Sequence, residues 1–307
     1  MPGPNLSLTL SAADALLTAW SQALADDIGT RQLLIKGRTL AHHGLRAPRT
    51  SSDVDVLVDP ARFDDYCAAV TEAGWAELPE TFVTKFFTLH SRTFTREGWP
   101  NTLDIHRYFP GFLDDPGAVF EELWKRRETL SVAQHDCAIV DRSSSFLILA
   151  LHSLRSSRRS QRPGDELEGL TRSEFGPAEL DDIIRLAHAT GSAAPLRATF
   201  TAMGVDVPLD SAVIASPEYR DWVQLVAAAE GSPADWGSVL RRAPWGQKGR
   251  VLFRAVWPAR VDLQRAHPEA AGSPMALFRV RLSRLRRGSR WLFTGSTAER
   301  EAGRSGD

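Results

Sequence analysis

Hydrophobic and polar positions alternate most clearly in DVDVLV, residues 53–58. A period of two predicts a strand with Asp53, Asp55 and Leu57 on one face and the three valines on the other. The preceding apolar run RQLLIKG predicts a shorter strand that ends in a turn at Gly37. Aspartate is depleted in strands, because burying an unpaired carboxylate is costly. The two aspartates therefore call for a chemical explanation.

Helical spacing dominates three other segments of the first half. SAADALLTAWSQAL predicts a helix capped by Ser11 and Asp14, and RTLAHHGL predicts a short one. Asp59 and Pro60 predict the start of a further helix, as N-cap and first helical residue, and Gly74 predicts its end. Its apolar stripe consists of Phe63, Tyr66, Cys67 and Val70.

A hairpin separates these elements from a helical second half. VTKFFTLHSRTFT (83–95) and TLDIHRYF (102–109) predict its two strands. After Asp115 and Pro116, the spacing predicts helices over AVFEELWKRRETL, SSFLILALHSLRSS and PAELDDIIRLAHATG. The pattern predicts an α+β fold, a mixed sheet flanked by helices, followed by a mainly helical half. We expect a catalytic domain over residues 1–141 and a helical domain over 142–307.

Composition places the chain among ordinary globular proteins. Of its 307 residues, 43% are hydrophobic and 24% charged, which argues against a disordered chain. Cys67 and Cys137 are far apart in the sequence and outside any metal-finger spacing, which favours free thiols in a reducing, cytoplasmic compartment. The sequence begins without a signal-peptide pattern, and its apolar runs are shorter than the ~20 residues of a membrane span.

Charge is unevenly distributed along the chain. Residues 241–307 contain 15 Lys and Arg against 5 Asp and Glu, a balance of +10, and residues 1–240 carry −11. The segment RVRLSRLRRGSRW (279–291) could bind nucleic acid or lie on a membrane surface. We favour an amphipathic helix that packs its leucines inward and turns its arginines toward acidic groups, so nucleic acid is a possible partner but not the favoured one.

The candidate chemistry lies in the strand carboxylates. Asp53 and Asp55 share a face, and Asp104 with His106 shares a face of the second hairpin strand. If these strands are neighbours, three carboxylates meet on one surface. Oxygen-rich clusters suit Mg²⁺, and two such ions can activate an attacking oxygen and stabilise a leaving pyrophosphate.

The order of these motifs resembles that of a known enzyme superfamily. LLIKG, RAPRTSSDVDVLV and TLDIH are similar to the glycine turn, the D-x-D strand and the third-aspartate strand of the polymerase-β-type nucleotidyltransferases. Lys-Gly in place of Gly-Ser, the long gap before Asp53, and LDIH resemble one bacterial nucleotidyltransferase family within it. LALHSLRSS and LDDIIRLA resemble that family's helical region, with His152 and Asp182 at the matching polar positions. The resemblance spans roughly residues 30 to 190.

The resemblance implies a role for each matching residue. Asp53, Asp55 and Asp104 would hold two Mg²⁺ or Mn²⁺ ions, and Asp104 would accept the proton of the attacking hydroxyl. Gly37 would let the backbone approach the triphosphate of an NTP co-substrate. Neutralisation of the phosphates is expected from Lys36 and Arg49. The superfamily's serine has no counterpart at the turn, which leaves Ser51 and Ser52 as substitutes.

The resulting hypothesis is a metal-dependent nucleotidyltransferase that moves a nucleoside monophosphate from an NTP to a hydroxyl or phosphate. The acceptor stays open between a peptide, a small metabolite, a protein and RNA. The alternatives are a catalytically weak module of the same fold that only binds, and an RNA-directed enzyme that uses the basic segment. We expect no catalytic role for the histidines. We interpret His106 as structural, His152 as part of a buried polar pair with Asp182, and His42 and His43 as ordinary surface residues.

Overall fold

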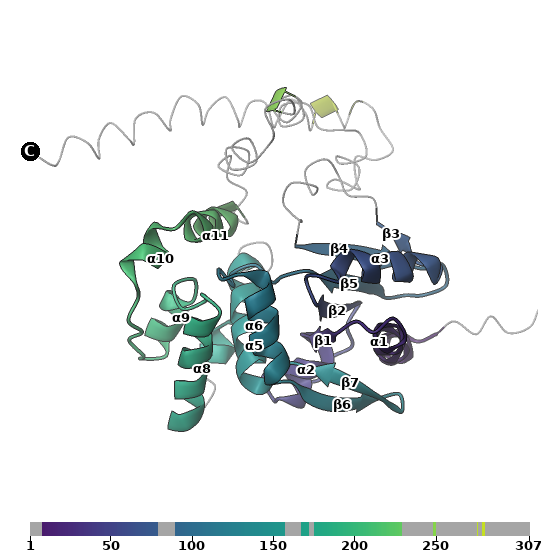
Figure 1. The fold of residues 1–307 in the computed structure, drawn as a ribbon, viewed down its shortest axis with the longest axis horizontal. Coiled ribbons are helices and arrows are strands. Elements are labelled where there is room, and N and C mark those ends of the chain that lie inside the picture. The colour runs from purple at the N-terminus through teal and green to yellow at the C-terminus, as the bar shows by residue number, and fades with distance from the viewer. Residues whose placement is uncertain are drawn as a thin grey trace, which may run out of the picture. The chain divides into compact units, whose positions relative to one another are not determined.

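The computed structural model describes residues 8–78, 90–156, 167–171 and 175–228, together with the single positions 248, 249, 275, 278 and 279. The chain divides into two compact units, residues 1–79 with 88–230, and residues 80–87 with 231–307. The sheet and the labelled helices belong to the first unit (Figure 1). Most of the basic segment 279–291 lies outside the described residues, so the interpretations of it stay predictions.

The core of the first unit is a seven-stranded mixed sheet, which confirms the predicted α+β class. Its order is β3-β4-β5-β2-β1-β7-β6. Strand β2 pairs antiparallel with β1 and parallel with β5, and β1 also pairs parallel with β7. The strands are β1 (Gln32–Ile35), β2 (Asp53–Val58), β3 (Ala76–Glu77), β4 (Ser91–Thr95), β5 (Thr102–His106), β6 (Glu128–Val132) and β7 (His135–Ile139).

Helices cover both faces of this sheet (Figure 1). Helices α1 and α3 pack on one face, and α5, α6 and α8 pack on the other. The helices are α1 (Leu10–Asp27), α2 (Gly37–His42), α3 (Phe63–Glu72), α5 (Pro116–Lys125), α6 (Arg142–Ser156), α8 (Pro177–Ala189), α9 (Arg197–Ala202), α10 (Ser211–Ala215) and α11 (Pro217–Ala228). None of the helices in the described part of the chain combines the length and the apolar character needed to cross a bilayer.

The period-two pattern of β2 places its side chains as predicted. Val54, Val56 and Val58 belong to the core on the α1 and α3 side, whereas Leu57 belongs to the core under α6. The aspartates share Leu57's face, so they point toward the layer that contains α6. The apolar stripe of α3 is buried as expected, and Cys67 and Cys137 are both free, buried thiols.

Several predicted element ends are wrong. Thr9, not Ser11, caps α1, because its hydroxyl accepts the backbone N–H of Ala12. Asp59 and Pro60 form a turn ahead of α3, which begins only at Phe63. Asp59 Oδ1 accepts the N–H of Ala61 in this turn and Oδ2 pairs with Arg31 at 2.6 Å, so its carboxylate does not cap α3.

The predicted helix over 118–130 is also too long. Helix α5 ends at Lys125. The last residues of the predicted helix instead begin β6, the first strand of the hairpin β6–β7, which the sequence analysis did not predict. Ala133 and Gln134 form the turn of this hairpin with φ of +48° and +64°. Two successive residues with positive φ suit a tight hairpin turn, but Gly or Asn is the usual signal for it. Without that signal, the sequence analysis did not predict this hairpin.

The helical half shares a core with the sheet. Leu33, Ile35 and Leu57 from the strands pack in the same cluster as Phe146 and Leu147 of α6. Residues 142–228 lie in one compact unit with the sheet. Residue 142 thus marks a change in secondary structure, and its role as a domain boundary stays a prediction.

Candidate metal centre

Strand pairing brings the three aspartates of the sequence analysis together. Asp55 and Asp104 are directly opposite each other in the parallel pair β2–β5, and Asp53 is opposite Thr102. One carboxylate oxygen from each of the three aspartates lies within 4.8 Å of the other two. Like charges at this spacing repel unless a proton or a cation intervenes. The geometry therefore provides a compact group of oxygen ligands.

Asp55 is the most constrained of the three. Its side chain is 5% exposed, and Oδ1 lies 2.5 Å from Lys36 Nζ and 3.0 Å from His106 Nε2. Burial alone would raise the pKa of Asp55, but the ammonium of Lys36 and the imidazole of His106 outweigh it and hold the pKa well below its usual range. Asp55 is thus a carboxylate under ordinary conditions. His106 contacts it directly, in line with the expected supporting role.

Asp104 has the opposite electrostatic balance. Burial and the nearby charge of Asp55 raise its pKa from 3.8 to about 6. Its Oδ1 is buried and has no hydrogen-bond partner among the described residues. A buried oxygen without a partner is unfavourable, so a ligand for it is to be expected. A carboxyl with a pKa near neutrality can also exchange a proton under working conditions.

The residues directly before β2 orient Asp53. Ser51 Oγ donates to Asp53 Oδ1 at 2.6 Å, and the carbonyl of Ser51 accepts the side-chain N–H of Asn101 at 2.7 Å. The carbonyl of Ser52 accepts the N–H of Thr102 at 3.0 Å, while the Ser52 residue is exposed. Of the two candidate serines, only Ser51 thus directs its hydroxyl at the carboxylates.

The turn between β1 and α2 has an unusual backbone. Lys36 has φ +59° and ψ −153°, a region that is essentially restricted to glycine and costs a side-chain-bearing residue about 1–3 kcal/mol. Gly37 follows with φ +46°, and the space where its side chain would begin is open. This conformation accompanies the contact between Lys36 and Asp55. A strained residue at a carboxylate cluster indicates function, because the fold retains it despite its cost.

Helix α6 adds positive charge that the sequence analysis missed. The Arg155 side chain is partly buried, and this burial lowers its pKa to about 10 although the charge of Asp55 acts in the opposite direction. Its guanidinium lies over the ring of Phe109, 5.3 Å from the centroid. His152 lies one helical turn earlier, and burial together with Lys36 and Arg155 lowers its pKa to about 3. The sequence feature that could have revealed them is the i, i+3 spacing of His152 and Arg155 in LHSLR, which places both residues on one helix face.

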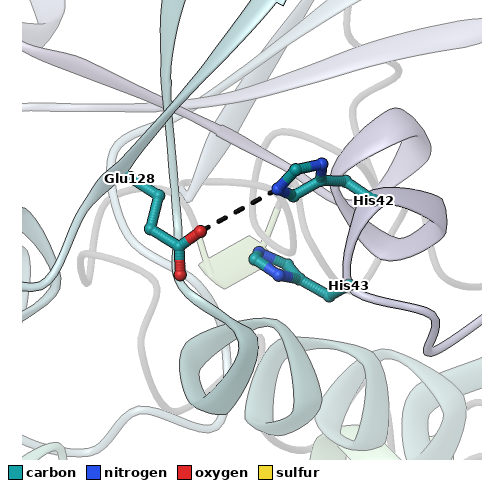
Figure 2. Close-up of side chains that lie close together, drawn as sticks. All are labelled: His42, His43 and Glu128. Atoms are coloured by element: carbon teal, nitrogen blue, oxygen red, sulfur yellow. Dashed lines mark ion pairs between the residues drawn. The ribbon is translucent and has the colours of Figure 1, made fainter.

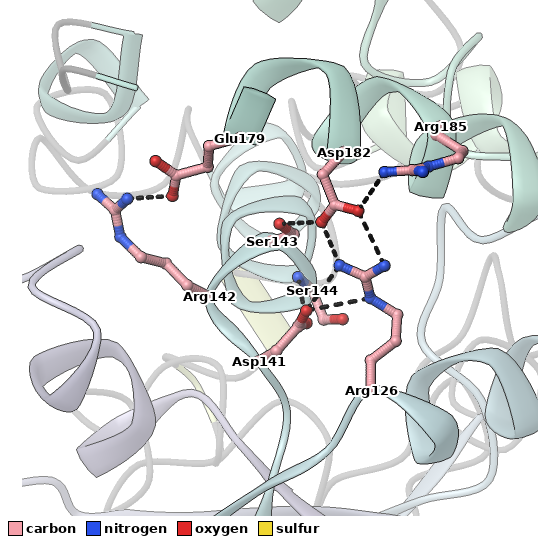
Figure 3. Close-up of polar contacts among 8 residues, drawn as sticks. All are labelled: Arg126, Asp141, Arg142, Ser143, Ser144, Glu179, Asp182 and Arg185. Atoms are coloured by element: carbon pink, nitrogen blue, oxygen red, sulfur yellow. Dashed lines mark hydrogen bonds and ion pairs between the residues drawn. The ribbon is translucent and has the colours of Figure 1, made fainter. Parts of the chain in front are cut away.

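Asp182 belongs to a different polar cluster (Figure 3). Arg126 joins it to Asp141: Nη1 donates to Asp182 at 3.0 Å and Nε donates to Asp141 at 3.0 Å. Ser143 Oγ also donates to Asp182 at 2.7 Å. Hydrogen bonds from Arg126 hold the pKa of Asp182 below its usual value. The predicted pairing of Asp182 with His152 is wrong, because Asp182 links α8 to the ends of α5 and β7.

Arg49 lies in the loop that precedes β2. It is exposed and lines a cavity of about 530 Å³ together with Arg38, Asp14 and His42. The described lining of this cavity includes none of the three aspartates. A role of Arg49 beside Asp53 or Asp104 therefore stays a prediction from the resemblance.

Comparisons with known proteins give matches only among solved structures. No family model matches the chain, and no curated protein does. A lincosamide antibiotic adenylyltransferase bound to lincomycin is 14% identical, with a TM-score of 0.35, and the match covers 52% of this chain and 95% of that one. The antibiotic-resistance factor ANT(2'')-Ia is 13% identical, with a TM-score of 0.41 and coverages of 60% and 96%.

A third structure is an antigenic nucleotidyltransferase-like protein from Paracoccidioides brasiliensis. It is 14% identical, with a TM-score of 0.37, and the match covers 67% of this chain and 97% of that one. These structures include nucleotidyltransferases, the class that the sequence motifs resemble. At this level of similarity they add no argument about activity, which has to come from the site itself.

Proposed function

We propose that this protein is a metal-dependent nucleotidyltransferase, which moves a nucleoside monophosphate from an NTP to a hydroxyl or phosphate of an acceptor. The observation that carries the proposal is the close grouping of the Asp53, Asp55 and Asp104 carboxylates across two paired strands. A protein that only binds nucleotide has no chemical need for three mutually repelling carboxylates. Their arrangement on rigid strands supports a site in which geometry matters.

The residues fit a hard divalent cation such as Mg²⁺ or Mn²⁺. All three candidate ligands are carboxylates, the donor type that these ions prefer. The buried Oδ1 of Asp104 lacks a partner among the described residues, and a cation would supply one. When bound, such ions lower the proton affinity of an attacking oxygen and stabilise the charge that develops on the departing pyrophosphate.

The chain's own groups would divide the remaining tasks. The acceptor oxygen forms a bond to the α-phosphorus of the NTP, the bond to the bridging oxygen breaks, and pyrophosphate leaves. Asp104, which lies beside the other two carboxylates, would accept the acceptor's proton. Asp53 and Asp55 would hold the metal, and the hydrogen bond from Ser51 would fix the orientation of Asp53.

Phosphate recognition would come from the turn after β1. Gly37 offers an open approach to the backbone, and Lys36 supplies a positive charge. Lys36 contacts Asp55 in the structure, so it would exchange this carboxylate for phosphate oxygens when nucleotide and metal bind. Arg49 and Ser52 complete the set that the resemblance implies, and Arg155 contributes further positive charge close to Asp55.

The test is a screen for pyrophosphate release. Purified protein would be incubated with each of the four NTPs, with Mg²⁺ or Mn²⁺, and with candidate peptide, metabolite, protein and RNA acceptors. We expect release that depends on metal and acceptor in wild type and is absent in Asp53→Asn and Asp104→Asn. Tight NTP binding with no release under any condition would favour the binding module. Release with RNA alone would favour the RNA-directed enzyme.

A further inference from the structure

His42, His43 and Glu128 form a second group of possible metal ligands, outside the three aspartates. His42 and His43 end helix α2, and Glu128 begins strand β6, some 85 residues later in the chain. One ligand atom from each lies within 4.8 Å of the other two. Figure 2 shows both imidazoles and the carboxylate directed at a common space between the helix and the strand. The sequence analysis assigned the histidines to ordinary surface.

The spacing between His42 and Glu128 is wrong for a direct hydrogen bond and suited to a bridging ion. His42 Nε2 lies 3.9 Å from Glu128 Oε2, beyond hydrogen-bond range. Two ligands of a tetrahedral Zn²⁺, each about 2.1 Å from the ion, are separated by roughly 3.4 Å. A small rotation of two partly exposed side chains would close this difference. Without a metal, a surface ion pair at 3.9 Å contributes little to the stability of the protein.

The hydrogen bonds of His43 fix its tautomer in a form that can bind metal. Its Nε2 lies 2.8 Å from the carbonyl oxygen of Val140, which can only accept, so Nε2 carries the proton. In the neutral ring the lone pair is then on Nδ1. Histidines that bind metals commonly donate their other N–H to a backbone carbonyl. The His43 backbone is fixed too, because its carbonyl accepts Arg142 Nε at 3.1 Å.

From this geometry we propose a site for a divalent transition metal of the Zn²⁺ class, with His42, His43 and Glu128 as its protein ligands. Two imidazoles and one carboxylate are donors that favour Zn²⁺ over Mg²⁺. Three protein ligands leave one position of a tetrahedral ion for water or another ligand. The side chains of His42 and Glu128 are 39% and 47% exposed, so this fourth position is accessible from solvent.

Binding at this site would fasten α2 to the edge of the sheet. Strand β6 is the last strand in the sheet order, and α2 begins directly after Lys36. An ion held from both sides would therefore restrain the segment that carries Lys36 and Gly37. The inference does not depend on the proposed nucleotidyl transfer, since its ligands and its metal class are different.

Calorimetric titration with Zn²⁺ in excess Mg²⁺ tests the proposal. We expect one site per chain in wild type. His42→Gln and Glu128→Gln should weaken this binding at least about 100-fold, since even indirect partners of metal ligands contribute 10- to 100-fold. His188→Gln is the matched control, because it removes an exposed histidine from α8. The double variant Asp53→Asn/Asp104→Asn should retain the Zn²⁺ site.

A nitrogen NMR spectrum of the histidine rings provides a second, independent readout in wild-type protein. Zn²⁺ should shift His43 Nδ1 and His42 Nε2, while His43 Nε2 keeps its proton. Unchanged Zn²⁺ affinity in both His42→Gln and Glu128→Gln would overturn the proposal. So would loss of the Zn²⁺ site in the aspartate double variant alone, which would assign the ion to the strand carboxylates.

Discussion

Asp55 and Asp104 face each other across the parallel strands β2 and β5, yet their carboxyl groups have opposite electrostatic balances. Lys36 and His106 hold the pKa of Asp55 below its usual range, whereas burial and Asp55 itself raise the pKa of Asp104. One group is thus ionised across the ordinary pH range, whereas the other changes its protonation state near pH 6. The pair provides two distinct chemical roles from one type of side chain.

The first prediction separates the structural role of Asp55 from that of Asp53. Both Asp53→Asn and Asp55→Asn should abolish pyrophosphate release. Repulsion among the carboxylates alone predicts that either change stabilises the protein, but Asp55→Asn leaves the Lys36 ammonium without its buried partner. We expect Asp55→Asn to lose about 3 kcal/mol of unfolding free energy and Asp53→Asn to lose little. Urea unfolding in EDTA measures the difference, and equal stability of the two variants would contradict it.

The second prediction concerns pH. The folded-state pKa of Asp104, about 6, lies above its ordinary value of 3.8, so the folded protein binds this proton more tightly. The stability that the folded state gains from binding this proton is complete below about pH 4 and is lost as the pH rises through 6. Wild type should therefore lose about 2 kcal/mol relative to Asp104→Asn between pH 4 and pH 7. The measurement is the unfolding free energy of both proteins across this pH range without divalent ions. An equal pH dependence in wild type and Asp104→Asn would contradict the prediction.

The third prediction tests competition between Lys36 and a cation for Asp55. In Lys36→Gln the Asp55 carboxylate loses its ammonium partner, 2.5 Å away, and becomes available to Mg²⁺. We expect a lower melting temperature in EDTA and a larger rise on addition of Mg²⁺ than in wild type, by ligand linkage. Lys125→Gln, an exposed lysine on α5, is the control. A Mg²⁺ response identical to that of wild type would show that Lys36 does not compete.

The fourth prediction concerns the cluster in Figure 3. Arg126 binds Asp141 and Asp182 with a planar guanidinium that lysine cannot replace. Arg126→Lys should destabilise the protein by about 1–2 kcal/mol, since charged hydrogen bonds are lost, without changing NTP affinity. Arg127→Lys, whose side chain lies over Trp124, is the neighbouring control. The measurements are a thermal melt and a nucleotide titration of each variant. A melting temperature of Arg126→Lys equal to that of wild type would contradict a stabilising role for Arg126.

The fifth prediction concerns the basic segment 279–291. If it is a packed helix, Leu282→Asp and Leu285→Asp should each destabilise the protein by a few kcal/mol, about what an unpaired charge in an apolar contact costs. Wild type should then bind nucleic acid only weakly at physiological salt. A filter-binding titration at two salt concentrations, beside the melts, is the measurement. Tight binding that falls steeply with salt, together with unchanged melts, would identify a nucleic-acid segment instead.

Local pattern alone determined much of this protein. The alternation in residues 53–58 correctly assigned each side chain of β2 to a face, because the period of a strand is a property of the backbone. The apolar stripe of α3 was likewise evident from the sequence. The proximity of Asp104 to Asp53 and Asp55 was predicted on one condition, that the strands are neighbours.

Tertiary structure decided what no local pattern contains. Pairing of β2 with β5 set the register that puts Asp55 opposite Asp104, and packing of α6 on that face brought Arg155 into range of Asp55's charge. The positive-φ backbone of Lys36 is stable only because the surrounding contacts compensate its strain. His43 and Glu128 meet because β6 folds onto the sheet edge beside α2. The physical reason is common to all four: periodicity fixes the direction of a side chain, but burial of the whole core selects its partner.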